Sequence, residues 1–67
     1  MKLKTYLTEN KITQEEFIAQ VKETTGHEIS QGGLSKYVIG QRVPRKDQIL
    51  AIYKTTEGAV DPNSFYL

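Results

Sequence analysis

Three polar side chains are spaced so that one helix would present them on the same side: those of Gln31, Ser35 and Lys36. Their amide, hydroxyl and ammonium groups can hydrogen-bond to base edges or to phosphate oxygens. The apolar residues of the same stretch follow the i, i+3, i+4 spacing of a buried helical stripe, which consists of Leu34, Tyr37 and Val38. The sequence therefore predicts a short helix, about Ser30–Ile39, with one side packed inward and an outer side chemically suited to nucleic acid.

The ends of this helix and the chain after it support the same interpretation. The Ser30 hydroxyl can accept a hydrogen bond from a first-turn N–H, and Gly40 can end the helix. Residues 29–46 contain four cationic side chains and no acid, namely Lys36, Arg42, Arg45 and Lys46. The whole chain carries a net charge of only +1. A local basic patch on a nearly neutral protein suits a polyanion that docks on one face.

Length and composition limit the other roles that the chain could have. Its 67 residues predict a single domain, residues 1–67, with a small core. The absence of cysteine excludes a thiolate zinc site, and a single histidine, His27, excludes a metal site built from several imidazoles. We therefore expect no metal, no cofactor and no small-molecule ligand. No apolar run approaches a membrane span and no signal peptide is recognisable, so we expect a cytoplasmic protein without a membrane partner.

Two helices are predicted before the central one. The first lies within residues 1–10 and is amphipathic. The second runs from Gln14 to about Thr25, because Thr13 and Glu16 form a capping box at its start and Gly26 is a natural stop. The predicted apolar faces of the two helices consist of Leu3, Tyr6, Leu7, Phe17, Ile18 and Val21.

A fourth helix is predicted after the bend that Pro44 imposes, from about Arg45 to Thr56. Its apolar stripe is wide, which suggests that the helix is covered on more than one side; the stripe consists of Ile49, Leu50, Ile52 and Tyr53. We expect Tyr53 and Tyr6 to lie in the core. The apolar residues at the end of the tail would either fold back onto the core or contact another subunit.

These elements, taken in order, resemble the small Cro and repressor-type helix-turn-helix proteins of bacteria and their phages. The resemblance is carried by residues 13–17 (TQEEF), 29–38 (ISQGGLSKYV) and 40–44 (GQRVP), and by the tail residues 58–62 with Phe65. It implies an all-α fold, a compact helix-turn-helix domain of the lambda-repressor/Cro-like type with four or five helices and a short C-terminal extension. It also implies a bacterial or phage-encoded transcriptional regulator, such as a repressor, that inserts the helix Ser30–Ile39 into the major groove of an operator.

Carried over by position, the resemblance gives individual residues a role. The residues where the family contacts bases correspond to Gln31, Gly32, Ser35 and Lys36. The residues near its phosphate contacts correspond to Gln14, Gln41, Arg42, Arg45 and Lys46. A two-fold dimer is expected, at least on DNA. Its surface is predicted to involve the fourth helix and the tail, with contacts from Val60, Phe65 and Tyr66.

The chain departs from the family at three points. The connection through Lys22–Glu28 is longer than the usual tight turn. Ile18 stands where the family usually has a small residue at a helix crossing. Gly32 and Gly33 occupy the first turn of the recognition helix, and each costs about 1 kcal/mol of helix propensity relative to alanine. Either the glycines let the backbone approach DNA closely, or they leave a frayed helix start.

Two other classes of function are alternatives to DNA binding. A protein-binding helical module, an inhibitor or adaptor, would use the fourth helix and the apolar tail. An enzyme is not expected, because the sequence contains no nucleophile–base set, no glycine-rich phosphate loop and no metal cluster. Glu15, Glu16 and Glu23 follow a helix cap and are more simply explained by helix stability than by acid–base chemistry.

Overall fold

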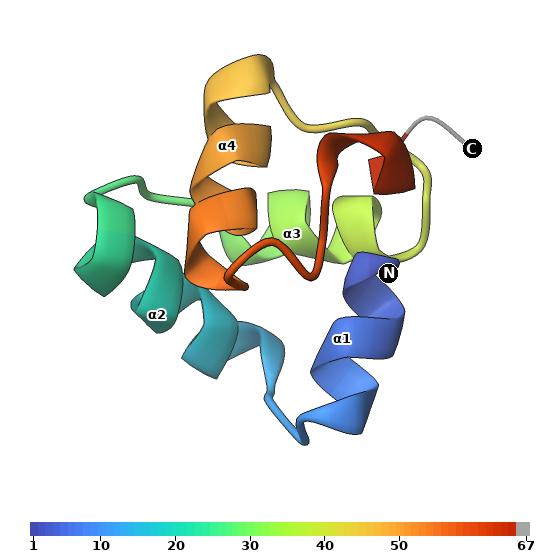
Figure 1. The fold of residues 1–67 in the computed structure, drawn as a ribbon, viewed down its shortest axis with the longest axis horizontal. Helices are drawn as coiled ribbons and strands as arrows, with labels where there is room; N and C mark the ends of the chain where they lie inside the picture. The colour runs from blue at the N-terminus through green and yellow to red at the C-terminus, as the bar shows by residue number, and fades with distance from the viewer. Residues whose placement is uncertain (66–67) are drawn as a thin grey trace.

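The computed structural model describes residues 1–65, which form four α-helices and one short 3-10 helix. The helices are α1 (Leu3–Glu9), α2 (Gln14–Thr25), α3 (Gln31–Val38), α4 (Lys46–Thr55) and η1 (Pro62–Phe65). None of the described residues belongs to a strand, so the prediction of an all-α domain is confirmed. In Figure 1, α4 crosses in front of α3, α1 and α2 lie to either side, and η1 lies beside the start of α1. None of the helices within residues 1–65 combines the length and apolar character needed to span a bilayer.

The boundaries of α2 follow from the signals predicted for it. The Thr13 hydroxyl accepts a hydrogen bond from the Glu16 N–H at 3.1 Å, and the Glu16 carboxylate accepts one from the Thr13 N–H at 3.0 Å. This reciprocal capping box satisfies two N–H groups that the helix itself cannot satisfy. At the other end, Gly26 has a φ of +78°, a conformation that glycine adopts without a side-chain clash.

The start and the end of α3 are also set by local chemistry. The Ser30 hydroxyl accepts a hydrogen bond from the Gly33 N–H at 3.1 Å. A Cβ on Gly33 would lie 2.9 Å from that hydroxyl oxygen, whereas a Cβ on Gly32 would meet nothing within 4 Å. The small size of Gly33 is therefore explained by the cap above it, but nothing inside the domain explains Gly32. Gly40 ends the helix with a φ of +80°.

The core holds the four helices at fixed positions. Its largest fully buried side chains come from different parts of the chain and are Phe17, Val21, Leu34, Ile52 and Val60. Burying one such side chain contributes about 1.5–3 kcal/mol, so a domain this small depends on nearly all of them. Tyr6 packs edge-on against Phe17, with ring centroids 6.2 Å apart, and joins α1 to α2. Ile18 is half-buried and packs against the same core.

A buried hydroxyl, that of Thr56, fixes the chain after α4 against the end of that helix. Thr56 donates to the Ile52 carbonyl at 2.9 Å and accepts from the Val60 N–H at 3.1 Å. The Val60 side chain is 0% exposed, so the prediction that it contacts another subunit is wrong for this fold. Phe65 is half-buried against the core, which leaves only part of its ring for a partner. Tyr66 lies outside the described residues.

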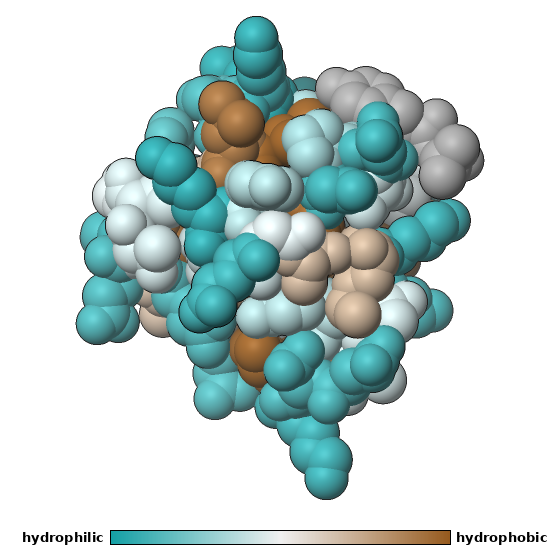
Figure 2. Space-filling view, in the orientation of Figure 1, coloured by the Kyte–Doolittle hydropathy of each residue, from teal (hydrophilic) through white to brown (hydrophobic). Residues whose placement is uncertain are grey.

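The outer side of α4 differs from the prediction of a helix covered on more than one side. Ile49, Ala51 and Ile52 are buried, but Leu50 is 48% exposed and Tyr53 is 42% exposed. The two exposed side chains are three residues apart and therefore lie on one side of the helix. Figure 2 shows hydrophobic surface over the upper part of α4, surrounded by hydrophilic side chains. The prediction that Tyr53 is a core residue is wrong.

Candidate nucleic-acid interface

Most of the outer side of α3 is open to solvent. Gln31, Gly32 and Lys36 are exposed, whereas Leu34 on the opposite side is 0% exposed. Two of the predicted base-contacting side chains and the exposed backbone at Gly32 are therefore on a surface that a duplex could reach. The buried side of α3 packs against α2 and α1, which fixes how this surface is presented.

Ser35 has a partner that the sequence did not reveal. Its hydroxyl donates to the Gln14 side-chain oxygen at 2.7 Å, and both residues are half-buried. A serine at this place in a helix could bond DNA or the carbonyl of the preceding turn. The observed bond instead joins the outer side of α3 to the first residue of α2. It orients the Gln14 amide so that its nitrogen, which is not used by Ser35, can donate to a further acceptor.

The four basic residues of the acid-free stretch are all exposed. Within residues 1–65, neither ion pair involves any of them, because these pairs join Lys22 to Glu28 and His27 to Asp47. The charges of Lys36, Arg42, Arg45 and Lys46 are thus not neutralised by a neighbouring carboxylate in the described structure. Cations without a local partner are available to phosphates, which supply most of the affinity of nucleic-acid binding.

The loop between α3 and α4 is held in place although its cationic side chains are exposed. The Gln41 N–H donates to the Lys36 carbonyl at 2.9 Å, and Pro44 is buried. Arg45 occupies the N-cap position of α4 and makes no side-chain capping bond. The start of α4 carries two exposed cations, Arg45 and Lys46, followed by one carboxylate, Asp47, in the first turn.

Two features of this region were not predicted from sequence. Ile39, which follows Ser35 by one turn, is 63% exposed, and Val43 in the loop is 47% exposed. Neither residue belongs to the predicted apolar stripe of α3, which consists of Leu34, Tyr37 and Val38. In addition, the Tyr37 hydroxyl donates to the Gln48 side-chain oxygen at 2.7 Å and links α3 to α4. A tyrosine at the edge of a core often has such a partner, but its identity depends on the tertiary fold.

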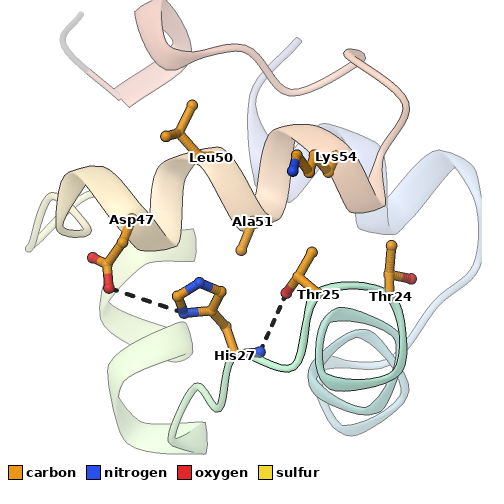
Figure 3. A pocket seen from close by; sticks show the side chains of 7 residues that line it. All are labelled: Thr24, Thr25, His27, Asp47, Leu50, Ala51 and Lys54. Carbon is orange, nitrogen blue, oxygen red and sulfur yellow. Dashed lines mark hydrogen bonds and ion pairs between the residues drawn. The ribbon is translucent and has the colours of Figure 1, made fainter.

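The hollow between the end of α2 and α4 offers a different chemistry (Figure 3). His27 lies in it with its Nδ1 3.9 Å from an Asp47 oxygen, too far for a hydrogen bond, and its backbone N–H donates to the Thr25 hydroxyl at 3.3 Å. Leu50 and Lys54 complete one wall. No cluster of three or more His, Cys, Asp or Glu side chains that could hold a metal ion occurs within residues 1–65. The hollow brings the turn before α3, at His27, close to the first turn of α4, at Asp47.

The pKa shifts in the protein belong to its supporting structure. The backbone hydrogen bond from Thr13, followed by that from the Thr13 hydroxyl, lowers the pKa of the Glu16 carboxyl. The Lys22 ammonium, through a hydrogen bond and then its charge, lowers the pKa of Glu28. Both carboxylates are fully exposed and act at a helix start and in the α2–α3 connection, respectively.

Comparisons with protein-family models, curated proteins and solved structures find no match to this chain. The case for a function is therefore made by the residues themselves and by where the fold places them.

Proposed function

We propose that this protein is a sequence-specific double-stranded DNA-binding regulator of transcription. The observation that carries the proposal is the outer side of α3, where Gln31, Gly32 and Lys36 are exposed on a short helix beside a run of cations without carboxylate partners. A helix with such a side fits the major groove, whose base edges offer hydrogen-bond acceptors and donors. The same placement of polar and basic groups is expected of a Cro or repressor-type helix-turn-helix protein.

Each part of the surface has a distinct task in this proposal. Lys36 donates to the acceptors of a guanine, and Gln31 pairs with an adenine. Gly32 allows the backbone to approach the duplex closely. The phosphate contacts come from the start of α2 and from the loop after α3, through Gln14, Gln41, Arg42, Arg45 and Lys46. Bound protein would then block or recruit the polymerase.

A two-fold dimer would read two half-sites about 34 Å apart. Since Val60 is buried within the chain, the exposed Leu50 and Tyr53 on α4 are the better candidates for a subunit contact among the described residues. This assignment keeps the predicted α4 contribution and replaces the predicted contribution of Val60.

The test begins with binding of the intact protein to a random duplex at low salt, followed by selection of bound sites from a random duplex pool. We expect salt-sensitive binding and a consensus with two-fold symmetry. Failure to bind any duplex at low salt would overturn the proposal. A selected consensus without two-fold symmetry would support DNA recognition but contradict the proposed dimer.

The exposed side of α4 supports a second candidate function, that of a protein-binding helical module. Leu50 and Tyr53 present apolar surface on a helix whose flanking residues, Asp47 and Lys54, are charged. Such a module would bind a partner protein, show little affinity for DNA and lack a steep salt dependence. The low-salt duplex experiment separates the two candidates, because only the regulator is expected to bind.

A further inference from the structure

A basic groove lies at the C-terminal end of α3 and extends the surface described so far beyond Arg42. Its walls come from the first residues of the chain, the end of α3 with the following loop, and η1. Three of the side chains that line it are cationic, those of Lys2, Lys4 and Arg42, and none of the lining residues within 1–65 is acidic. Nothing local in the sequence shows that the start of α1 lies beside the loop of Arg42, so this groove could not be predicted from spacing.

This groove is continuous with the predicted phosphate contacts. Lys4 and Val38 line both the groove and a neighbouring hollow, whose other walls include Thr13 and Gln14. That second hollow also contains no acidic residue. A path of donors and cations thus runs from Gln14, through Lys4, to Arg42. At its α2 end, Gln14 is hydrogen-bonded to Ser35 on the outer side of α3.

The residue before Lys2, Met1, is anchored through both its ammonium group and its carbonyl group. The Met1 ammonium donates to the Ala59 carbonyl at 2.7 Å, and the Ser64 hydroxyl donates to the Met1 carbonyl at 2.8 Å. Ser64 is itself held by the Asp61 carboxylate, which accepts from the Ser64 backbone N–H at 3.1 Å. The return of the chain after α4 therefore positions the start of α1, so Lys2 and Lys4 project from an ordered segment.

We propose that Lys2 and Lys4, together with Arg42, form a phosphate-binding cradle that contacts the DNA backbone beside the major groove occupied by α3. The inference rests on the proposed function and adds a third anchor, from α1, to those at α2 and the α3–α4 loop. A polyanion is favoured over a single free phosphate because the cations are spread along an open groove and are continuous with other phosphate-binding groups. Neither Lys2 nor Lys4 makes an ion pair with a described residue, so both charges are available.

The experiment compares two double variants of the full chain that lose the same charge. Lys2→Gln with Lys4→Gln removes the cations of the cradle. Lys22→Gln with Lys54→Gln removes two exposed cations on the α2–α4 side, of which Lys54 lines the separate hollow around His27. Each pair lowers the net charge by two, so a purely long-range effect of charge would be the same for both. Thermal unfolding verifies that all proteins are folded.

The readout is the dependence of duplex affinity on salt concentration. Each phosphate contact contributes about 0.9 to the slope of log K against log salt. We expect the cradle variant to lose about 1.8 from the slope, because it gives up two phosphate contacts, and the control variant to retain most of it. Equal slopes for the two variants would overturn the cradle. If the wild-type protein binds no duplex, the proposed function fails first, so the two failures are distinguishable.

A second arm locates the contacts and separates DNA from a free anion. Ethylation of single phosphates in the selected site should weaken the wild-type protein at one or two positions and leave the cradle variant unaffected there. Inorganic phosphate is titrated into both proteins in parallel. Saturable binding of inorganic phosphate to the wild type, with no ethylation-sensitive position, would assign the groove to a small anion and contradict the proposal.

Discussion

The Lys36 side chain makes no ion pair that stabilises the described fold, and it is free to contact a ligand. It is exposed on the outer side of α3, and no described carboxylate pairs with it. Replacing it should therefore leave the stability of the fold nearly unchanged. In the proposed complex its ammonium would donate to acceptors on a guanine, whereas Arg45, at the start of α4, would contact a phosphate.

Lys36→Ala is expected to weaken operator binding by about 1–3 kcal/mol and to relax the preference at one base pair, because a base contact discriminates between sequences. Arg45→Ala should instead weaken all sequences alike and reduce the salt slope by about one. Binding curves on the selected site and on single-base variants of it, each at several salt concentrations, separate the two effects. Unchanged operator affinity in both variants would show that this surface is not the DNA-binding one.

The two glycines of α3 have different physical reasons to be glycine. A Cβ on Gly33 would press on the Ser30 hydroxyl at 2.9 Å, whereas a Cβ on Gly32 would point into open space. Within the domain, Gly32 only lowers helix propensity. Its presence is explained if the backbone at this position must approach another molecule closely.

Gly32→Ala should raise the free energy of unfolding by up to about 1 kcal/mol and, at the same time, weaken duplex binding. Gly33→Ala is the matched control, in which the gain in propensity is offset by disturbance of the Ser30 cap. Urea unfolding and duplex titration of both variants provide the measurements. A Gly32→Ala protein that is more stable and binds DNA as well as the wild type would mean that Gly32 makes no close approach.

At the scale of the elements, the ends of the helices were more predictable than their outer surfaces. Thr13, Ser30 and Gly26 start or end a helix through contacts with residues only a few positions away, so their roles could be predicted from the sequence. Whether Leu50 and Tyr53 are buried depends on whether a second element covers that side of α4, and no local sequence pattern predicts this. The bond between Ser35 and Gln14 and the meeting of Lys4 with Arg42 likewise join distant segments and could not be predicted from spacing.

The capping box of α2 makes a prediction about acid. Because hydrogen bonds from Thr13 lower the pKa of Glu16 in the folded protein, the ionised form stabilises the fold above the ordinary pKa of about 4.5. That contribution is lost as the pH falls through the lowered, folded-state value. Glu16→Gln can keep a hydrogen bond at the cap but has no proton to gain, so its stability should decline less steeply in acid.

Urea midpoints between pH 7 and pH 3 test this expectation, the pH range being chosen to bracket the carboxyl pKa at about 4. Glu15→Gln removes one charge from the same helical turn but leaves the capping box intact, and it serves as the control. A Glu16→Gln protein that loses stability in acid as steeply as the wild type would contradict the role given to the box.

The buried Thr56 hydroxyl links α4 to the tail. Thr56→Val keeps the shape of the side chain but leaves the buried Val60 N–H without its acceptor, which should cost about 1–3 kcal/mol of folding free energy. Thr55→Val is the matched control, since the Thr55 hydroxyl donates only to the Ala51 carbonyl at 2.8 Å within its own helix. Denaturant midpoints that fall equally for both variants would show that the link to Val60 contributes no special stability.

At the scale of the whole molecule, the net charge is small, but the positive charges are concentrated in one region. The net charge is +1, yet residues 29–46 carry no acid and the groove beside them adds Lys2 and Lys4. The exposed apolar pair of α4 belongs to a different part of the surface, formed by another helix. A regulator could therefore use α3 for the duplex and α4 for a second subunit without either contact obstructing the other's residues.

The most direct measurement of the central claim is a titration of an isotopically labelled protein with a short duplex, followed by backbone amide shifts. If α3 enters the groove, the largest changes should fall within residues 31–36 and 41–46 and at Gln14, while the amides around Leu50 and Tyr53 change little at the first additions. Shifts that gather on α4 and leave residues 31–36 unchanged, or no shifts at all at low salt, would contradict the account.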